Sequence, residues 1–549
     1  MNLRPYQQQA ADAIFRAWED APSTLVVLPT GTGKTLLFAE VIRRNLPGRA
    51  LVLAHRGELV YQAKDKIERF AGIESQIEMA DLRADEHGLL SRAPAVVGSI
   101  QTQTSGGDGG GRMSKFDPMN FNLLVIDECH HAISPIFRRC MDYYRRNPAL
   151  RILGVTATPD RADEEALGQV FGSVAFDYEI LDAINDGWLV PVEQQMVHVS
   201  GLDFSGCRTT AGDLNGADLS AVMEAEESLH GIADPAFRIA EGKRAILFAA
   251  SVEQAERLAE ILNRHRQDCA AWVCGKTDKD TRRKILSDFA SGRVQFVCNC
   301  GVLTEGFDDA GVELIFMARP TKSRALYAQM AGRAIRPADS IAHALNDAQD
   351  ATVRRRMIEQ SAKPRCLIVD FVGNSGRHKL MTTADILGGN VSDEAAEEAV
   401  RKARETGKPV DMAEALKKAQ AEIEARKRAE EAKRLALKAK AQFTTSKVNP
   451  FDVLDISPAI ERGWHKGKTL SEKQAALLMK NGINPEGLPY VQAKQVLDEM
   501  FRRWGNGLAT FGQAKVLKKN GIHVPLRREE ASRMIDRIAS QQNWKRGAA

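Results

Sequence analysis

One stretch, Ser23–Leu37 (STLVVLPTGTGKTLL), constrains the fold of this chain more than any other. Its apolar run ends at Pro29, a turn with two glycines follows, and Lys34 opens a helical pattern. In a strand–loop–helix unit of this kind, glycines let the backbone approach a polyphosphate and direct its N–H groups inward. Lys34 would reach the terminal phosphates, and the hydroxyl of Thr35 would bind Mg²⁺. Leu28 stands where the usual pattern has its first glycine, so a plain Gly-rich turn is the alternative.

A second chemical signal is the segment Leu123–His130, LLVIDECH, an apolar run that ends in two acids. Asp127 at the end of the strand would hold the Mg²⁺ beside the loop. Glu128 would then orient and deprotonate an attacking water, as hydrolysis of a γ-phosphate requires. The alternative is a solvated Asp-Glu turn that merely ends a strand, and the presence of Lys34 disfavours it.

The composition predicts several globular domains. The 549 residues suffice for roughly three or four domains of the usual size, and 44% of them are hydrophobic. The N-terminal sequence MNLRPYQQQA has no apolar signal region, and no apolar run approaches the ~20 residues of a membrane span. The eight cysteines are scattered without a C-x-x-C pair. We therefore expect a soluble, cytoplasmic protein with reduced core thiols, no zinc and no membrane partner.

Strands and helices alternate along two parts of the chain, 1–182 and 183–382. Such alternation predicts a parallel sheet with helices on both faces, whose ligands bind at the carboxyl ends of the strands. The expected fold class is therefore α/β, with two such lobes in tandem. The segments 202–231 and 340–363 interrupt the pattern and are expected to be insertions, the second of them helical. The expected strands are Thr24–Leu28, Ala50–Ala54, Ala95–Ser99, Asn122–Asp127, Arg151–Thr156, Arg244–Ala249, Ala270–Cys274, Val294–Asn299, Val312–Ala318 and Arg365–Phe371.

The last part of the chain changes character. Residues 391–445 are rich in Ala, Glu, Lys and Arg, which predicts a long exposed helix that serves as a charged linker; a coiled coil is disfavoured because no apolar heptad is sustained. Residues 446–549 contain a repeat offset by 39 residues, SEKQAALLMKNGI and TFGQAKVLKKNGI. Each copy begins with a capping box and ends its first helix at a glycine. Two helical hairpins, or one four-helix unit, are expected, with second helices over Tyr490–Trp504 and Arg528–Gln541.

The net charge of +4 is unevenly distributed. Residues 446–549 contain 18 Lys and Arg against 10 Asp and Glu, a balance of +8, whereas the first 445 residues have a balance of −4. A basic tail suggests a polyanionic partner, and a solvated lysine-rich face is the alternative. Aromatic residues interleaved with basic ones can stack on unpaired bases, but in a small helical unit they more often form the core. They are Trp464, Tyr490, Phe501, Trp504, Phe511 and Trp544.

Further motifs resemble superfamily 2 helicases of the DEAD/DEAH-box type, and they occur in the order that this family shows. Asp127–His130 (DECH) resembles motif II. The other segments are Leu3–Gln7 (Q motif), Leu51–Leu59 (motif Ia), Gly98–Thr102, Gly154–Pro159 (motif III), Ile246–Ser251 (motif IV), Leu303–Asp308 (motif V) and Gln329–Pro337 (motif VI). The resemblance covers about residues 1–375. It implies two RecA-like lobes, ATP and Mg²⁺ as cofactors, and a nucleic-acid partner.

The resemblance also implies roles for individual residues. Nucleotide binding is implied for Arg4, Gln7, Pro29, Thr30, Gly31, Thr32, Gly33, Lys34, Thr35, Gly306 and Asp308, and catalysis for Lys34, Asp127, Glu128, Gln329, Arg333 and Arg336. Thr35 and Asp127 would hold the Mg²⁺. Because Arg333 and Arg336 are three residues apart, both guanidinium groups can face the charge of a phosphoryl-transfer transition state. They belong to the second lobe, so the active site would form in the cleft between lobes.

Other positions would serve the nucleic acid. Contacts with its phosphates are expected from Arg56, Gln101, Thr102 and Thr304, since such side chains bind phosphates without reading bases. Thr156, Thr158 and His130 would couple metal occupancy to the opposite lobe. For the two threonines, a capped turn before Pro159 is the alternative.

The core looks most similar to bacterial RadD-type DNA repair helicases, but the paired cysteines of the zinc modules of those proteins are missing from this sequence. We expect an ATP-dependent helicase or translocase that acts on DNA in repair, recombination or replication. The alternatives are an RNA helicase or double-stranded-RNA-activated ATPase, and a non-processive ATP-dependent clamp. The helical repeats could also bind a protein partner.

Overall fold

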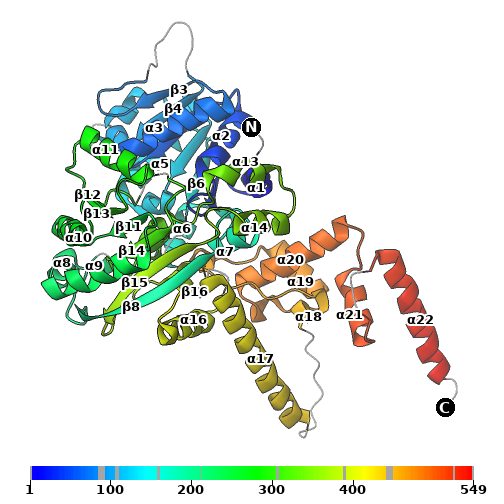
Figure 1. Cartoon of the computed structure of the whole chain (residues 1–549). Coiled ribbons are helices and arrows are strands. Elements are labelled where there is room, and N and C mark those ends of the chain that lie inside the picture. Colours follow the sequence, from blue (N-terminus) through cyan, green and yellow to red (C-terminus); the bar gives the residue numbers. More distant parts are fainter. Residues whose placement is uncertain are drawn as a thin grey trace. The chain divides into compact units, whose positions relative to one another are not determined.

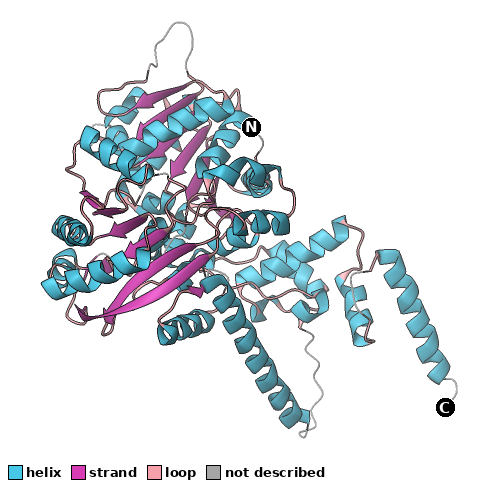
Figure 2. Ribbon diagram, viewed as in Figure 1, coloured by secondary structure: helices cyan, strands magenta, loops and turns pink. Residues whose placement is uncertain are grey.

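The computed structural model describes residues 3–84, 93–105, 111–157, 161–210, 212–304, 307, 309–387, 391–439, 449–522 and 526–546. The chain forms two compact units, one of Met1–Asp163 and Gln169–Lys427, the other of Glu164–Gly168 and Arg428–Ala549. The first unit contains two lobes, each built on a sheet with helices on its faces (Figures 1 and 2). The domain boundaries given above stay predictions.

Lobe 1 is a parallel sheet in the order β3-β4-β2-β5-β6-β1-β7. All five strands expected here are present, and the central ones are buried along their length because helices cover both faces. Sequence reasoning missed β3 and β7, the edge strands, whose residues are partly polar. The elements are α1 (Pro5–Asp20), β1 (Ser23–Val27), α2 (Lys34–Asn45), β2 (Ala50–Ala54), α3 (Gly57–Lys66), a π-turn (Ile67–Ala71), β3 (Ser75–Glu78), β4 (Ala95–Ser99), α4 (Ile100–Thr104), β5 (Leu123–Asp127), α5 (Pro135–Tyr144), β6 (Arg151–Thr156), α6 (Arg161–Val170, shared with the second unit), β7 (Ser173–Asp177) and α7 (Ile180–Asn185).

Lobe 2 has the sheet order β12-β13-β11-β14-β15-β8-β16, parallel except for β16, which runs antiparallel to β8. The five expected strands are present, and β8 was missed. The elements are β8 (Val192–Asp203), α8 (Gly216–Met223), α9 (Glu226–Ala240), β11 (Ala245–Phe248), α10 (Val252–His265), β12 (Ala270–Val273), α11 (Lys279–Ala290), β13 (Phe296–Asn299), β14 (Leu314–Met317), α12 (Arg324–Ala331), α13 (Asp339–Asp347), α14 (Ala351–Glu359), β15 (Cys366–Asn374), α15 (Thr383–Leu387) and β16 (Val410–Asp411).

The segment 202–231 is not a loose insertion. It ends β8, forms the hairpin β9 (Thr209–Thr210) and β10 (Asp213–Leu214), and continues through α8 into α9. Its apolar residues Phe204, Leu219 and Met223 are buried in a core shared with β11 and β14. The segment therefore completes one face of lobe 2.

Residues 391–445 do not form the single long exposed helix that their composition predicts. Instead, α16 (Asp393–Thr406) ends at Gly407, whose φ of 58° provides a left-handed cap, and β16 adds to the lobe 2 sheet before α17 (Met412–Ala439) begins. Alanines of α16 and residues Met412 and Leu416 of α17 are buried. The charged helix exists as α17, but Gly407 and the following Pro409 divide the segment.

The second unit is helical. The predicted capping boxes are present at Ser471 and Thr510, and the glycines after the first helices, Gly482 and Gly521, have φ of 76° and 73°. The two hairpins are α19 (Glu472–Lys480) with α20 (Tyr490–Gly505), and α21 (Phe511–Lys519) with α22 (Arg528–Arg546), preceded by α18 (Pro450–Leu454). The repeat thus specified both the helices and their ends.

The aromatic residues of this unit divide between core and surface. Trp464 and Phe511 are buried, whereas Phe501 and Trp504 are 49% and 37% exposed and pack edge to face on α20. The side chain of Trp544 lies outside the described residues. Tyr490 is half-buried. The expectation that aromatics form the core thus holds for Trp464 and Phe511 and not for Phe501 and Trp504.

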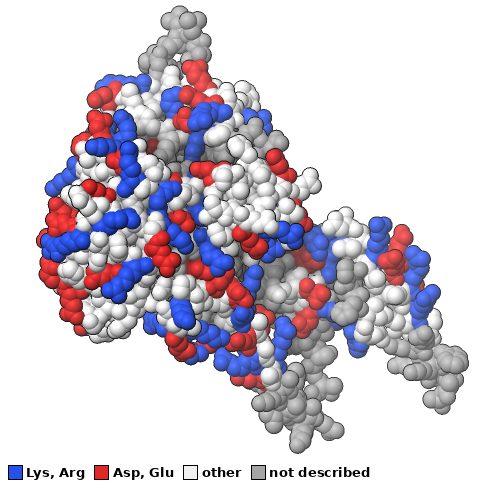
Figure 3. Space-filling model, viewed as in Figure 1, with Lys and Arg blue, Asp and Glu red and all other residues white. Residues whose placement is uncertain are grey.

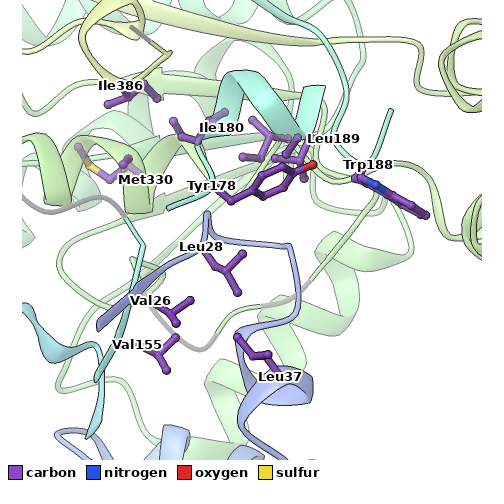
Figure 4. Close-up of a cluster of buried hydrophobic side chains, with 14 of the residues drawn as sticks. Val26, Leu28, Leu37, Val155, Tyr178, Ile180, Trp188, Leu189, Met330 and Ile386 are labelled. Atoms are coloured by element: carbon purple, nitrogen blue, oxygen red, sulfur yellow. The ribbon is translucent and has the colours of Figure 1, made fainter. Parts of the chain in front are cut away.

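A continuous apolar core joins the two lobes behind the phosphate loop. Val26 and Leu28, which lead into the loop, belong to the same buried cluster as Tyr178 and Trp188, and this cluster includes Met330 of α12 (Figure 4). The loop and motif VI are therefore held by one packed core. Among the described residues, no helix is both long and apolar enough to cross a bilayer.

Candidate ATP site between the lobes

The phosphate loop forms the turn from β1 to α2 that the sequence predicts. Gly31 and Gly33 have φ of 85° and 82°, which side-chain-bearing residues rarely adopt. Gly31 also leaves no room for a side chain, because a Cβ there would lie 2.8 Å from Cγ of Arg336. Gly33 immediately precedes α2, so the loop N–H groups lie at the positive end of that helix. The backbone here suits an anion.

Charged residues from β5 meet the loop at the carboxyl end of the sheet. Nζ of Lys34 lies 2.8 Å from Oε1 of Glu128, and both side chains are about nine-tenths buried. Glu128 has φ of 49°, an unusual conformation for a non-glycine residue, and such strain is typical of functional sites. Its N–H donates to Oδ1 of Asp127 at 3.0 Å. The lysine and both acids thus lie together.

The surroundings of the two acids shift their pKa values in opposite directions. Burial, reinforced by the neighbouring charge of Glu128, raises the pKa of Asp127 above its usual value. Burial also acts to raise the pKa of Glu128, but the ammonium of Lys34, together with His130, outweighs it and holds that pKa well below its usual value. Burial thus disfavours the charged form of Asp127, and a cation placed beside it would stabilise that form.

A magnesium ion fits this observation. Thr35 and Asp127 line the same cavity, and a hydroxyl with a carboxylate is an oxygen donor set of the kind that Mg²⁺ prefers. Mg²⁺ would supply charge neutralisation for the phosphates there. Gly306 and Asp308, expected to contact the nucleotide, lie outside the described residues.

Motif VI of lobe 2 closes the cavity from the opposite side. The lining includes Lys34, Thr35, Asp127 and Glu128 of lobe 1 and Arg333 and Arg336 of lobe 2. A Cβ at Gly332 would lie 2.7 Å from Cβ of Thr30, so motif VI packs directly on the loop.

The two arginines of motif VI also contact lobe 2 itself. Arg333 donates to the carbonyls of Thr304 (2.7 Å) and Phe307, and Arg336 faces Asp339 at 3.4 Å. Both arginines are therefore at the cavity, with Arg333 tied to motif V.

Gln329 and Pro29 lie behind this lining. Gln329 is buried on α12, one turn before Arg333, and Pro29 accepts hydrogen bonds from the N–H and hydroxyl of Thr32. Gln329 thus lies on the helix that leads to the arginines, and Pro29 closes the loop turn through its two contacts with Thr32.

His130 links motif II to motif III. Its Nδ1 lies 3.3 Å from the hydroxyl of Thr156, at the end of β6, and 3.5 Å from Oε2 of Glu128. The structure thus brings together two of the three expected coupling residues, and Thr158 lies outside the described residues. The ring of His131 contacts both His130 and His55, so these histidines form one cluster beside the acids.

The Q motif lies at the other end of the loop. Nε2 of Gln7 donates to the carbonyl of Thr32 at 2.9 Å, and its Oε1 accepts from the N–H of Arg4 at 3.0 Å. The hydroxyl of Tyr6 also donates to Thr32 O, at 2.6 Å. Gln7 therefore fixes the loop backbone while it lines a second cavity, with Arg4, Phe70 and others, that adjoins the first. This cavity is the expected base end of the nucleotide site.

Sequence reasoning missed several lining residues. Leu59, Gln62 and Lys66 form one face of α3, and Lys66 lies near Asp127 and Arg336. Burial and then the guanidinium of Arg336 lower the pKa of Lys66. Trp188, Leu345 and Asn346 also line the cavities. The helical spacing of Leu59, Gln62 and Lys66 could be read from the sequence, but only the folded chain shows that this face of α3 turns toward the loop.

Comparisons with known proteins agree with this geometry. The family described as "Type III restriction enzyme, res subunit" matches residues 1–161, and the family described as "Helicase conserved C-terminal domain" matches residues 227–338. The first match contains the phosphate loop and motif II, and the second contains motifs IV to VI. The chain thus contains both domains of a helicase core, and its motifs resemble those of superfamily 2 helicases.

Curated relatives match this chain over about two thirds of its length. The IRC3 protein of Saccharomyces cerevisiae, whose name describes an ATP-dependent helicase, is 29% identical over 390 residues, covering 68% of this chain and 52% of that protein. Rad25 of Haloarcula marismortui, named a DNA 3′-5′ helicase, is 29% identical over 377 residues, covering 66% of this chain and 56% of that protein. XPB of Kineococcus radiotolerans, also named a DNA 3′-5′ helicase, is 25% identical over 356 residues, covering 61% and 57%. The helicase thus spans little more than half the length of these curated relatives.

The residues expected to contact nucleic acid cluster at one end of the helicase sheets. Nη1 of Arg56 donates to the carbonyl of Gly301 in lobe 2 at 3.4 Å, and Nε2 of Gln101 donates to the carbonyl of His55 at 2.8 Å. The hydroxyl of Thr102 accepts from the N–H of Ala80. Thr304 is only 6% exposed in this arrangement. Acidic and basic side chains are intermixed over the visible face of the lobes (Figure 3), so that face offers no broad basic surface.

Proposed function

We propose that this helicase hydrolyses ATP at the cavity between its lobes and uses the cycle to move along DNA or to separate its strands. The observation that carries the proposal is the composition of that cavity, with Lys34, Asp127 and Glu128 from lobe 1 and Arg333 and Arg336 from lobe 2. A site divided between lobes can link nucleotide occupancy to their separation, which is what a motor requires.

Each group has a task in this scheme. Lys34 and the loop N–H groups bind the phosphates, Thr35 and Asp127 hold the Mg²⁺, and Glu128 accepts a proton from the attacking water. Arg336 stabilises the charge that develops on the transferring phosphoryl group, because a planar guanidinium matches that spread charge. Arg333 holds motif V against motif VI through its two carbonyl contacts.

DNA is proposed as the substrate, with RNA as the second candidate. The names of the Rad25 and XPB relatives, both called DNA 3′-5′ helicases, support DNA. A role in DNA repair, recombination or replication, a closer relationship to RadD-type helicases and a cytoplasmic location are part of this proposal. A non-processive clamp is the remaining alternative.

Steady-state ATP hydrolysis with matched single-stranded, duplex and forked DNA and with RNA tests the proposal. Hydrolysis should be stimulated by DNA more than by RNA. Arg336→Ala should lower kcat by about 10³-fold, the range for arginines that stabilise this transition state. Arg238→Ala, an exposed arginine of lobe 2, is the control. Stimulation by RNA alone would replace the DNA assignment, and a single turnover without a steady state would favour the clamp.

A further inference from the structure

The helical insertion after motif VI folds back toward the base end of the nucleotide site. It consists of α13 and α14, in the segment that interrupts the strand–helix alternation of lobe 2. Leu345 and Ile358 bury their side chains, each 1% exposed, so the insertion is packed and not a loose excursion. Ala342 and Leu345 line the phosphate cavity, and Asn346 lines the base cavity. In the base cavity, Asn346 is the lobe 2 residue of the lining, and the other lining residues come from lobe 1.

Arg354 anchors this insertion to the segment that joins the lobes. Its Nε donates to the carbonyl of Asp186 and its Nη1 to the carbonyl of Ala348, both at 2.7 Å. Its guanidinium lies 4.2 Å from the centroid of the Trp188 ring. A Cβ at Gly187 would lie 2.7 Å from Cβ of Arg354, so the fit depends on a glycine there. These contacts hold α14 and the end of α13 against the segment that joins the lobes.

Asn346 meets the Q motif directly. Its Oδ1 accepts a hydrogen bond from Nε of Arg4 at 2.9 Å, and Arg4 in turn lies 4.6 Å from the centroid of the Trp188 ring. This contact occupies the carbonyl of Asn346. Within the described part of the chain, no acceptor is bonded to its Nδ2, which leaves a donor at the mouth of a cavity that Gln7 and Phe70 also line.

We propose that α13 forms the lobe 2 wall of the base site, and that the carboxamide of Asn346 donates a hydrogen bond to a ring nitrogen of the bound base. The proposal rests on the proposed placement of the base beside Gln7. Because Gln7 and Asn346 belong to different lobes, a base that contacts both stabilises the closed arrangement, and binding of the base contributes to closure. Asn346 is then a residue that determines nucleotide affinity.

The test compares a ligand with a base and one without. ADP and pyrophosphate both carry a diphosphate, and calorimetry with the full chain gives both dissociation constants. Asn346→Ala should weaken the binding of ADP about three- to tenfold, which corresponds to the loss of one hydrogen bond, and leave the binding of pyrophosphate unchanged. Asn346→Asp should weaken ADP at least as much, since a carboxylate cannot donate. His343→Ala, an exposed residue of the same helix, is the matched control and should change neither.

The outcomes separate the two proposals. If Asn346→Ala leaves ADP binding unchanged, or weakens ADP and pyrophosphate equally, the role of Asn346 is overturned. If the wild-type chain binds ADP no more tightly than pyrophosphate, the cavity beside Gln7 is not a base site, and that part of the proposed function fails instead. Asn346 is exposed, so its substitution should not prevent folding.

Discussion

A buried carboxyl group connects the strands and helices behind motif VI. Asp370 on β15 accepts hydrogen bonds from Nε2 of Gln194 on β8, at 2.5 Å, and from the hydroxyl of Tyr327 on α12, at 2.9 and 3.0 Å. The same hydroxyl lies 3.0 Å from that of Thr383. Because α12 leads directly to Arg333, this network positions the lobe 2 side of the active site. Replacing Asp370 by Asn should change how the stability of lobe 2 depends on pH.

The magnitude follows from the pKa. Burial raises the pKa of Asp370 to about 6, from a usual value of 3.8. A carboxyl whose pKa is raised by folding favours the folded state while it is protonated, and that advantage is lost as the pH rises through the folded pKa. At pH 7 the charged group costs the folded state about 3 kcal/mol. Between pH 7 and pH 5 about 1.3 kcal/mol of this cost is removed.

Asp370→Asn has no charge to lose, so the wild-type chain should gain about 1 kcal/mol relative to the variant when the pH falls from 7 to 5. Hydrogen exchange of peptides from β8 and β15, corrected for intrinsic rates, measures this locally, which suits a chain of several units better than one melting temperature. Asp280→Asn, on the exposed face of α11, is the control. The same pH response in the wild type and Asp370→Asn would refute the reasoning.

Three further outcomes are expected. Lys34→Ala should abolish steady-state ATP hydrolysis, because the phosphates lose their ammonium; near-normal phosphate release would exclude this site. Removing residues 446–549 should weaken DNA binding and flatten the dependence of log Kd on log salt while basal hydrolysis persists, and an unchanged slope would assign the tail to protein docking. Lys66→Ala should weaken the binding of ADP–beryllium fluoride, whose fluoride complex mimics the γ-phosphate, about tenfold or more and leave the binding of ADP unchanged, as measured by calorimetry. Lys64→Ala, at a lysine that pairs with Glu68, should change the binding of neither ligand. Equal loss of affinity for both ligands in Lys66→Ala would contradict a γ-phosphate contact.

Local signals in the sequence predicted the elements that depend on local physics. The strands of both lobes are apolar runs with helices on either side, and their bounds were predicted to within one or two residues in most cases. The capping boxes at Ser471 and Thr510 fix helix starts through two reciprocal side chain–backbone hydrogen bonds within four residues, so they can be read directly from the sequence. Gly407 and Pro409 gave an equally local signal, but the alanine-rich composition around them concealed the break.

Features that depend on distant pairing could not be predicted in this way. Strand β8 alternates buried and partly exposed residues and takes its place in the sheet by pairing with β15, about 170 residues further along the chain. The face of α3 that carries Lys66 becomes a cavity wall only when motif VI of the other lobe is packed on the loop. The motifs identified the chemistry of the site, but the insertion α13–α14 and its contact with Arg4 required the folded chain.

The ion pair between Lys34 and Glu128 constrains the order of events in the proposed cycle. The ammonium that would bind phosphates is 2.8 Å from the carboxylate that would activate water, so in this arrangement each group blocks the other. A triphosphate carries more negative charge than one carboxylate and competes for the lysine directly. When it does, Glu128 loses its closest cation and becomes free to accept a proton. In the proposed cycle, the general base would thus be released only when terminal phosphates are present, which would limit activation of water to the occupied site.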